Sequence, residues 1–265
     1  MRLLFFVLLI FSFDVQSKIP EPGYGLPELA SEARIKELNS KKRAKVMTPS
    51  VQRKMQRVLE ALDEAGILEQ EQALLKKEKK DKEAEAKDKE IAKAIANGQR
   101  ELDDLKTRLA SLQSYDRSMY YYYSAYYNLA YQDKISEAMN NYVKLVAEKD
   151  TAEKLRVNAY YVLAQLYLSE SNYESGLDYL LRWFKNTAEV NPDGYVLLGQ
   201  AYYLLADKES TKSKVLASYQ KAYNNMVEAK RLADEKQIRF RENWYSLLLA
   251  SMGELDLKNE QVPVY

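Results

Sequence analysis

Three segments of the chain share one spacing: Tyr160-x2-Leu163-Ala164-x2-Tyr167, Tyr195-x2-Leu198-Gly199-x2-Tyr202 and Trp244-x2-Leu247-Leu248. An aromatic residue followed three positions later by leucine places both side chains on one face of a helix. In the first two segments a small residue and a second aromatic residue complete the pattern, and these segments start 35 residues apart. A period of about 20–50 residues indicates stacked structural repeats. The sequence therefore predicts an all-α fold built from successive pairs of helices.

Each predicted first helix is followed by a second one. Gly176 lies 12 residues after Ala164, and we expect these small residues to let the paired helices approach closely. An earlier, irregular pair has Ala125 and Ala138 13 residues apart. The pair that starts at Pro192 has a late second helix, which follows extra residues at 208–213 and extends toward 233. The sequence ends before the segment at 244 can form a pair, so we expect a fragment or truncated variant of a longer protein.

Residues 48–114 predict a charged helical or coiled-coil segment. Thr48-Pro49 is typical of a helix start, and 69–90 are nearly all charged, Gln or Ala residues. Apolar residues then recur at alternating spacings of four and three, with Gly98 in the one missing slot, which indicates a coiled-coil seam: Ile91, Ile95, Leu102, Leu105, Leu109 and Leu112. Asn97-Gly98 is a candidate turn. The pattern favours a hairpin or bent helix over one continuous rod, and Gly66 is a candidate end for the first helix.

The N-terminus predicts export. A signal peptide at 1–17 is indicated by Arg2, by the apolar run 3–13 and by the small residues before position 18. We expect it to be cut after Ser17 and to deliver the chain to the periplasm. An uncleaved membrane anchor is the alternative. Residues 18–47 contain several Pro and Gly and predict a flexible linker, with a short helix near 27–38. The basic cluster at 41–45 predicts a solvated segment, or alternatively contact with an anionic membrane surface.

Composition excludes several function classes. The chain has no His and no Cys, which removes Ser–His and Cys–His nucleophile pairs, disulfides and most zinc sites. A net charge of +1 provides no field for gathering nucleic acid. We therefore expect no enzyme, no metal, no cofactor, no nucleic acid and no small-molecule substrate.

Four stretches carry a resemblance to a known family: 41–51, 161–167, 192–203 and 242–244. The repeated spacing resembles the tetratricopeptide repeat, and residues 115–265 would form an α-solenoid of such repeats, the last one incomplete. The stretches together resemble exported tetratricopeptide proteins of marine gammaproteobacteria, described as components of TonB systems. The resemblance implies a periplasmic helper of the TonB–ExbB–ExbD energy-transducing uptake machine, with these proteins as partners. It implies no catalytic residues.

In this repeat architecture the first helix of each pair lines the concave side, where partners bind. The predicted protein-binding groove consists of Asn158, Tyr161, Gln165, Leu168, Asp193, Val196, Gln200, Tyr203, Glu242 and Tyr245. Amide side chains there could hydrogen-bond a peptide backbone, and tyrosines could anchor a partner. Many of the 22 tyrosines are instead expected to fill space between helices.

Two other functions fit the same sequence. A coiled segment ahead of helical repeats also resembles the envelope coordinator that links cell-wall synthesis to the Tol–Pal complex. A structural spacer, in which the charged helices matter and the groove is empty, is the second alternative. The oligomeric state is left open by the sequence.

Overall fold

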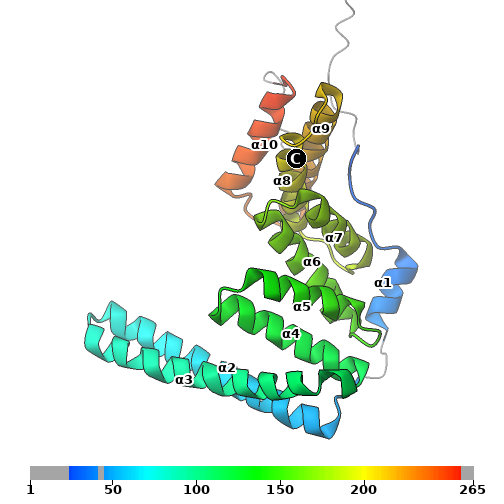
Figure 1. Cartoon of the computed structure of the whole chain (residues 1–265). Coiled ribbons are helices and arrows are strands. Elements are labelled where there is room, and N and C mark those ends of the chain that lie inside the picture. The colour runs from blue at the N-terminus through cyan, green and yellow to red at the C-terminus, as the bar shows by residue number, and fades with distance from the viewer. Residues whose placement is uncertain (1–23, 41–44, 258–265) are drawn as a thin grey trace, which may run out of the picture. The chain divides into compact units, whose positions relative to one another are not determined.

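The computed structural model describes residues 24–40 and 45–257. These residues form helices and no strand (Figure 1). In chain order the elements are α1 (Glu32–Asn39), α2 (Pro49–Lys77), α3 (Asp81–Thr107), the 3-10 turn η1 (Leu109–Ser111), α4 (Ser114–Tyr131), α5 (Ile135–Ala147), α6 (Glu153–Ser169), α7 (Tyr173–Asn186), α8 (Pro192–Ala206), α9 (Lys212–Glu235) and α10 (Glu242–Glu254). The predicted all-α class is confirmed for this part of the chain. The predicted signal peptide, 1–17, lies outside the described residues.

The chain divides into two compact units. We call Pro27–Val190 the N-terminal unit; it contains α1 to α7. The C-terminal unit combines Asn191–Tyr265 with Met1–Leu26, and its described parts are 24–26 and 191–257, which contain α8 to α10. Each unit has its own helix pairs and is considered separately below.

The charged segment is a hairpin of α2 and α3, which lie side by side along their length (Figure 1). The predicted hairpin is present, but the predicted turn at Asn97-Gly98 is wrong, because the chain reverses at 78–80. There Lys79 has a left-handed φ of 59°, and the amide of Lys80 donates to the carbonyl of Leu75 at 3.0 Å. This bond and the left-handed residue form a Schellman-type helix end. The expected helix end at Gly66 is also wrong, since α2 continues to Lys77.

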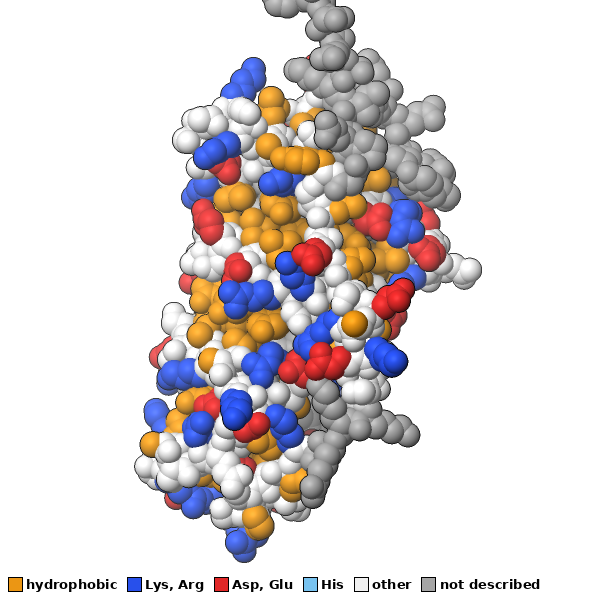
Figure 2. Space-filling view, turned by 90° about the vertical axis from the view of Figure 1, so that its right-hand side faces the viewer, with side chains coloured by type: hydrophobic (Ala, Val, Ile, Leu, Met, Phe, Trp, Pro, Cys, Tyr) orange, Lys and Arg blue, Asp and Glu red, His pale blue; other side chains and the backbone are white. Residues whose placement is uncertain are grey.

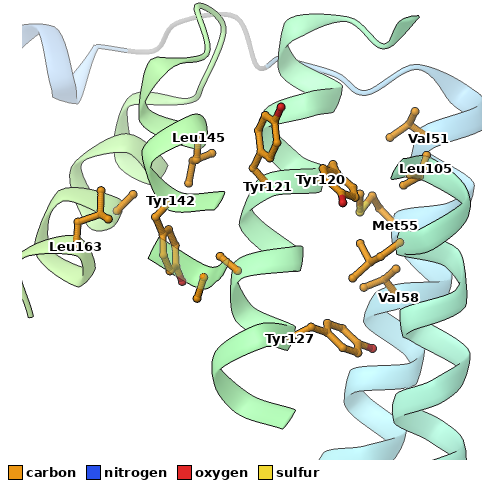
Figure 3. Packing of buried hydrophobic residues seen from close by; sticks show 14 residues of the cluster. Val51, Met55, Val58, Leu105, Tyr120, Tyr121, Tyr127, Tyr142, Leu145 and Leu163 are labelled. Atoms are coloured by element: carbon orange, nitrogen blue, oxygen red, sulfur yellow. The ribbon is translucent and has the colours of Figure 1, made fainter. Parts of the chain in front are cut away.

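Gly98 lies inside α3 for a packing reason. A Cβ built on it would be 1.7 Å from the hydroxyl oxygen of Tyr127, a residue of α4 that is fully buried. In Figure 3 the Tyr127 ring points from α4 toward the hairpin, near Val58 of α2. The missing side chain therefore makes room for a ring from another helix, and it does not provide a turn.

The hairpin and the next two helix pairs share one core. Buried residues from α2, α3, α4, α5 and α6 form a continuous cluster (Figure 3) that includes Met55, Leu105, Tyr127, Leu145 and Leu163. The tyrosine-rich helix α4 lies in the middle: Tyr120 and Tyr127 are buried, whereas Tyr126 is 42% exposed. The tyrosine run is therefore only partly in the core. Consecutive helical residues point in different directions, so α4 contributes to packing on more than one side.

Thr48 begins α2, as predicted, but its side chain does not cap that helix. Its backbone amide and its hydroxyl both donate to the carboxylate of Asp116, each at 2.9 Å. Asp116 is a buried residue of α4, so these bonds tie the start of the hairpin to α4.

Small residues occur where paired helices meet, as the sequence predicts. Gly176 of α7 is buried, and a Cβ there would be 2.7 Å from the side chain of Leu168 and 3.3 Å from the carbonyl oxygen of Ala164. In the C-terminal unit, a Cβ on Gly199 of α8 would be 2.9 Å from the sulfur of Met226. Helix α9 starts late, at Lys212, and continues to Glu235, as expected. Helix α10 then packs against α9.

Part of the segment predicted as a linker contacts the N-terminal unit. Helix α1 has no buried residue, yet the guanidinium of Arg34 donates to Asn186 at 3.1 Å and to Glu153 at 2.7 Å. The backbone amide of Ala30 donates to the carbonyl of Phe184 at 3.1 Å. Residues 30–39 therefore have specific partners on α6 and α7, which the composition of this segment does not indicate.

Candidate functional site

The ten predicted groove residues fall into the two units. Asn158, Tyr161, Gln165 and Leu168 belong to α6 in the N-terminal unit. The other six belong to α8 and α10 in the C-terminal unit.

Two of the four α6 residues are available to a partner. Asn158 and Gln165 are exposed, and their spacing of seven places them on one face of the helix. Tyr161 is half-buried, with its ring centroid 5.0 Å from that of Trp183 in α7. Leu168 is only 8% exposed and lies against Gly176. The assignment of Leu168 to the groove is thus incorrect, because its side chain fills the space that Gly176 leaves in the helix pair.

A hollow of about 290 Å³ lies beside Asn158. Its lining comes from α1, α6 and the end of α7 with the residues after it: Leu38, Asn39, Lys154, Val157, Asn158, Trp183, Asn186, Thr187, Ala188 and Glu189. The lining combines the largely buried Val157 and Trp183 with the side-chain amides of Asn39, Asn158 and Asn186. Apolar side chains together with polar ones suit a side chain of a peptide and its backbone.

The predicted groove residues of the C-terminal unit differ in their contacts and in their exposure. Asp193 of α8 pairs with Arg241 at 3.2 Å, and the Arg241 guanidinium lies 4.4 Å from the ring centroid of Trp244. The ion pair links the start of α10 to the start of α8, and the cation–π contact lies within the first turn of α10 itself. Glu242 and Gln200 are exposed, and Val196 is half-buried.

The two tyrosines of this group differ. Tyr203 has its ring centroid 5.2 Å from that of Tyr219, and desolvation raises the pKa of Tyr203 above its ordinary value and that of Tyr219 to about 12. Tyr203 is therefore part of the packing between α8 and α9. Tyr245 is 38% exposed and touches Phe240, with ring centroids 4.8 Å apart, so it presents more surface to a partner.

A second hollow, of about 480 Å³, was not predicted. It lies between α3, α4 and α5, and its lining is Gln99, Asp103, Lys106, Leu109, Tyr120, Tyr121, Ser124, Asn128, Gln132, Lys134, Glu137, Asn140, Asn141 and Lys144. Gln132 donates to Gln99 at 2.8 Å across it. The hydroxyl of Ser124 is buried without a hydrogen-bond partner. These residues come from three helices, and because they share no spacing the sequence gives no sign that they meet.

The charges of the molecule are mixed. Figure 2 shows one face on which Lys and Arg side chains alternate with Asp and Glu around apolar areas, with no large region of one sign. Across 24–40 and 45–257, no three His, Cys, Asp or Glu residues lie close enough to hold a metal ion. In the same ranges, no helix has both the length and the apolar character needed to cross a bilayer.

No family model matches the chain, and no curated protein or solved structure matches it either.

Proposed function

We propose that the chain is a periplasmic protein–protein interaction scaffold of the tetratricopeptide α-solenoid type, without catalytic activity. The observation that carries the proposal is the recurrent contact of small residues between paired helices. Gly176 packs against α6, and Gly199 packs against α9, each at the slot that the sequence pattern assigns. Helix pairs that share one geometry stack into extended surfaces suited to holding another protein.

The binding surface in this proposal is the exposed face of the first helices. In the N-terminal unit it combines Asn158, Gln165 and the hollow floored by Trp183. In the C-terminal unit it includes Gln200 and Tyr245. Amides provide donors and acceptors for a peptide backbone, and aromatic side chains provide contact area with little loss of conformational freedom.

The partners in this proposal are components of a TonB–ExbB–ExbD uptake system, which the chain would serve as an accessory protein. Support for the partners comes from the sequence resemblance, and support for the periplasmic location comes from the pattern at 1–17. The test is chemical cross-linking in the native host, followed by recovery of the tagged full chain from the periplasm. Recovery with TonB, ExbB or ExbD supports the proposal. Recovery with Tol and Pal proteins supports the envelope-coordinator alternative, and a cytoplasmic location contradicts both.

A spacer function needs a separate experiment, because it assigns the role to the α2–α3 hairpin. Glu71 pairs with Lys87 across this hairpin at 2.8 Å, which shows how the two helices are aligned. Deleting 71–77 and 81–87 removes about two turns from each helix and keeps the turn at 78–80. The buried contacts around Met55, Leu105 and Tyr127 are left intact. If the chain is a scaffold, the shortened variant should still be recovered with its partners after cross-linking. If the chain is a spacer, the shortened variant should lose its function in the host.

A further inference from the structure

Two adjacent asparagines of α9 hold a short piece of the N-terminal segment. The side-chain amide of Asn224 donates to the carbonyl of Tyr24 at 2.9 Å, and that of Asn225 donates to the carbonyl of Gly25 at 3.1 Å. Asn224 is 8% exposed and Asn225 is fully buried. Burying an amide is costly unless it is hydrogen-bonded, and asparagine is a poor helix former. The positions of both side chains are therefore explained by the backbone that they bind.

The surface also selects the side chain of Tyr24 and the absence of a side chain at Gly25. The ammonium of Lys221 lies 5.6 Å from the ring centroid of Tyr24 and 5.3 Å from that of Tyr202 in α8. Gly25 has a φ of 77°, and a Cβ built on it would be 2.2 Å from Cγ of Lys221. Only glycine tolerates both the left-handed backbone and this close approach. An aromatic residue followed by glycine is thus the sequence that this surface accepts.

One hydrogen-bonding group of the site is unused. Among the described residues, the side-chain oxygen of Asn225 is buried and has no hydrogen-bond partner. Its amide nitrogen already donates both to Gly25 and to the carbonyl of Lys221 in its own helix. The free oxygen can accept one N–H from a peptide that lies slightly differently from the present occupant.

We propose that α9 and the adjoining face of α8 form a binding site for an extended peptide with an aromatic–glycine sequence, and that Tyr24–Leu26 occupy it as an internal ligand. A partner segment of the same sequence type binds by displacing the internal one. A tethered ligand has an effective concentration on the order of 1 mM, so it competes strongly with any free peptide. This site is independent of the partners proposed above, because its contacts come from Asn224, Asn225, Lys221 and Tyr202, and none of these is a residue of the proposed groove.

The test uses the full chain and a labelled peptide with the sequence of 22–27, Pro-Gly-Tyr-Gly-Leu-Pro, capped at both ends. In the Gly25→Ala variant the added Cβ expels the internal segment, which hydrogen exchange of 24–26 should report as faster exchange. Fluorescence anisotropy should then show at least tenfold tighter peptide binding to Gly25→Ala than to the unmodified chain. The matched control is Gly66→Ala, where a Cβ would meet nothing within 4 Å.

Two further arms test the chemistry of recognition. A peptide with alanine in place of the second glycine should bind Gly25→Ala at least tenfold more weakly, and this arm changes nothing in the protein. Adding Lys221→Met, which keeps most of the apolar stem, should weaken binding about threefold to tenfold through loss of the cation. The proposal is overturned if Gly25→Ala leaves the exchange of 24–26 unchanged, or if the expelled site binds no peptide. Equal binding of the glycine and alanine peptides overturns it as well.

Discussion

Replacing Gly98 with alanine tests how the α2–α3 hairpin is joined to the helix pairs. In an ordinary helix interior this substitution stabilises by about 1 kcal/mol, because alanine has the higher helix propensity. At Gly98 the new methyl group would be 1.7 Å from the hydroxyl oxygen of Tyr127, 2.8 Å from its ring carbon Cζ and 3.1 Å from Cβ of Ala61. Tyr127 is fully buried, so its ring has no free space into which to move.

The size of the effect follows from two opposing terms. Overpacking a core typically costs about 1–3 kcal/mol, and a contact this short lies at the upper end of that range. Subtracting the gain in helix propensity leaves a net loss of about 2 kcal/mol in the free energy of unfolding. Gly66→Ala should instead gain about 0.5–1 kcal/mol, since its Cβ meets open space in the same hairpin.

Urea denaturation followed by circular dichroism measures both variants. The double variant Gly98→Ala/Tyr127→Phe removes the 1.7 Å contact and keeps the 2.8 Å contact, so it should recover about 1 kcal/mol of the loss. Tyr127→Phe alone should be neutral or stabilising by about 1 kcal/mol, because the hydroxyl is buried without a partner. If Gly98→Ala proves as stable as Gly66→Ala, the packing of α4 on the hairpin is refuted.

Three more predictions concern the core and the turns. Leu163→Ala should lower the unfolding free energy by about 2–5 kcal/mol in thermal or urea melts, because Leu163 is fully buried, and a loss below about 1 kcal/mol would contradict its burial. Burial raises the pKa of Tyr127 and Tyr142 to about 12, above the ordinary value of about 10 for an unfolded tyrosine. The folded state therefore holds these protons longer, so stability should be complete below pH 10 and fall as the pH rises through 12; urea midpoints measured across this range check it, and a flat profile opposes it. Lys79→Gly should gain about 0.5–1 kcal/mol, because glycine adopts the left-handed φ of 59° without strain, and a loss of stability would show that the turn is misplaced.

The helix pairs were predictable because their signal is local. Aromatic, leucine and small residues recur at fixed spacings, and Gly176 and Gly199 lie at helix contacts where the pattern places them. The late start of α9 was also visible, as an interruption of the same spacing at 208–213.

The turn of the hairpin was not predictable by the same means. A glycine after an asparagine is the usual sign of a helix end, yet Gly98 is needed for the Tyr127 ring, which comes from another helix. The actual turn lies in a run of charged residues, where Lys79 adopts a left-handed conformation without glycine or proline nearby. Both facts depend on tertiary packing, which overrides local propensity.

The candidate sites show the same limit. Spacing on α6 correctly gave Asn158 and Gln165 as exposed, but it placed the buried Leu168 on the same surface. Arg34 bonds to Glu153 and Asn186, which are 119 and 152 residues away, and Asn224 bonds to Tyr24, 200 residues away. Contacts across such distances leave no periodic trace in one sequence. The buried pair Asn224-Asn225 in the middle of a helix was the available sign of the peptide site.

Site-specific photo-cross-linking tests whether partners bind on the exposed face of the first helices. A photoreactive residue is placed at Gln165 of α6 or, as a control, at Glu174 of α7; both positions are exposed. We expect Gln165 to cross-link to a TonB, ExbB or ExbD protein in the native host and Glu174 to give little or no product. Equal yields at the two positions, or product only at Glu174, would contradict it.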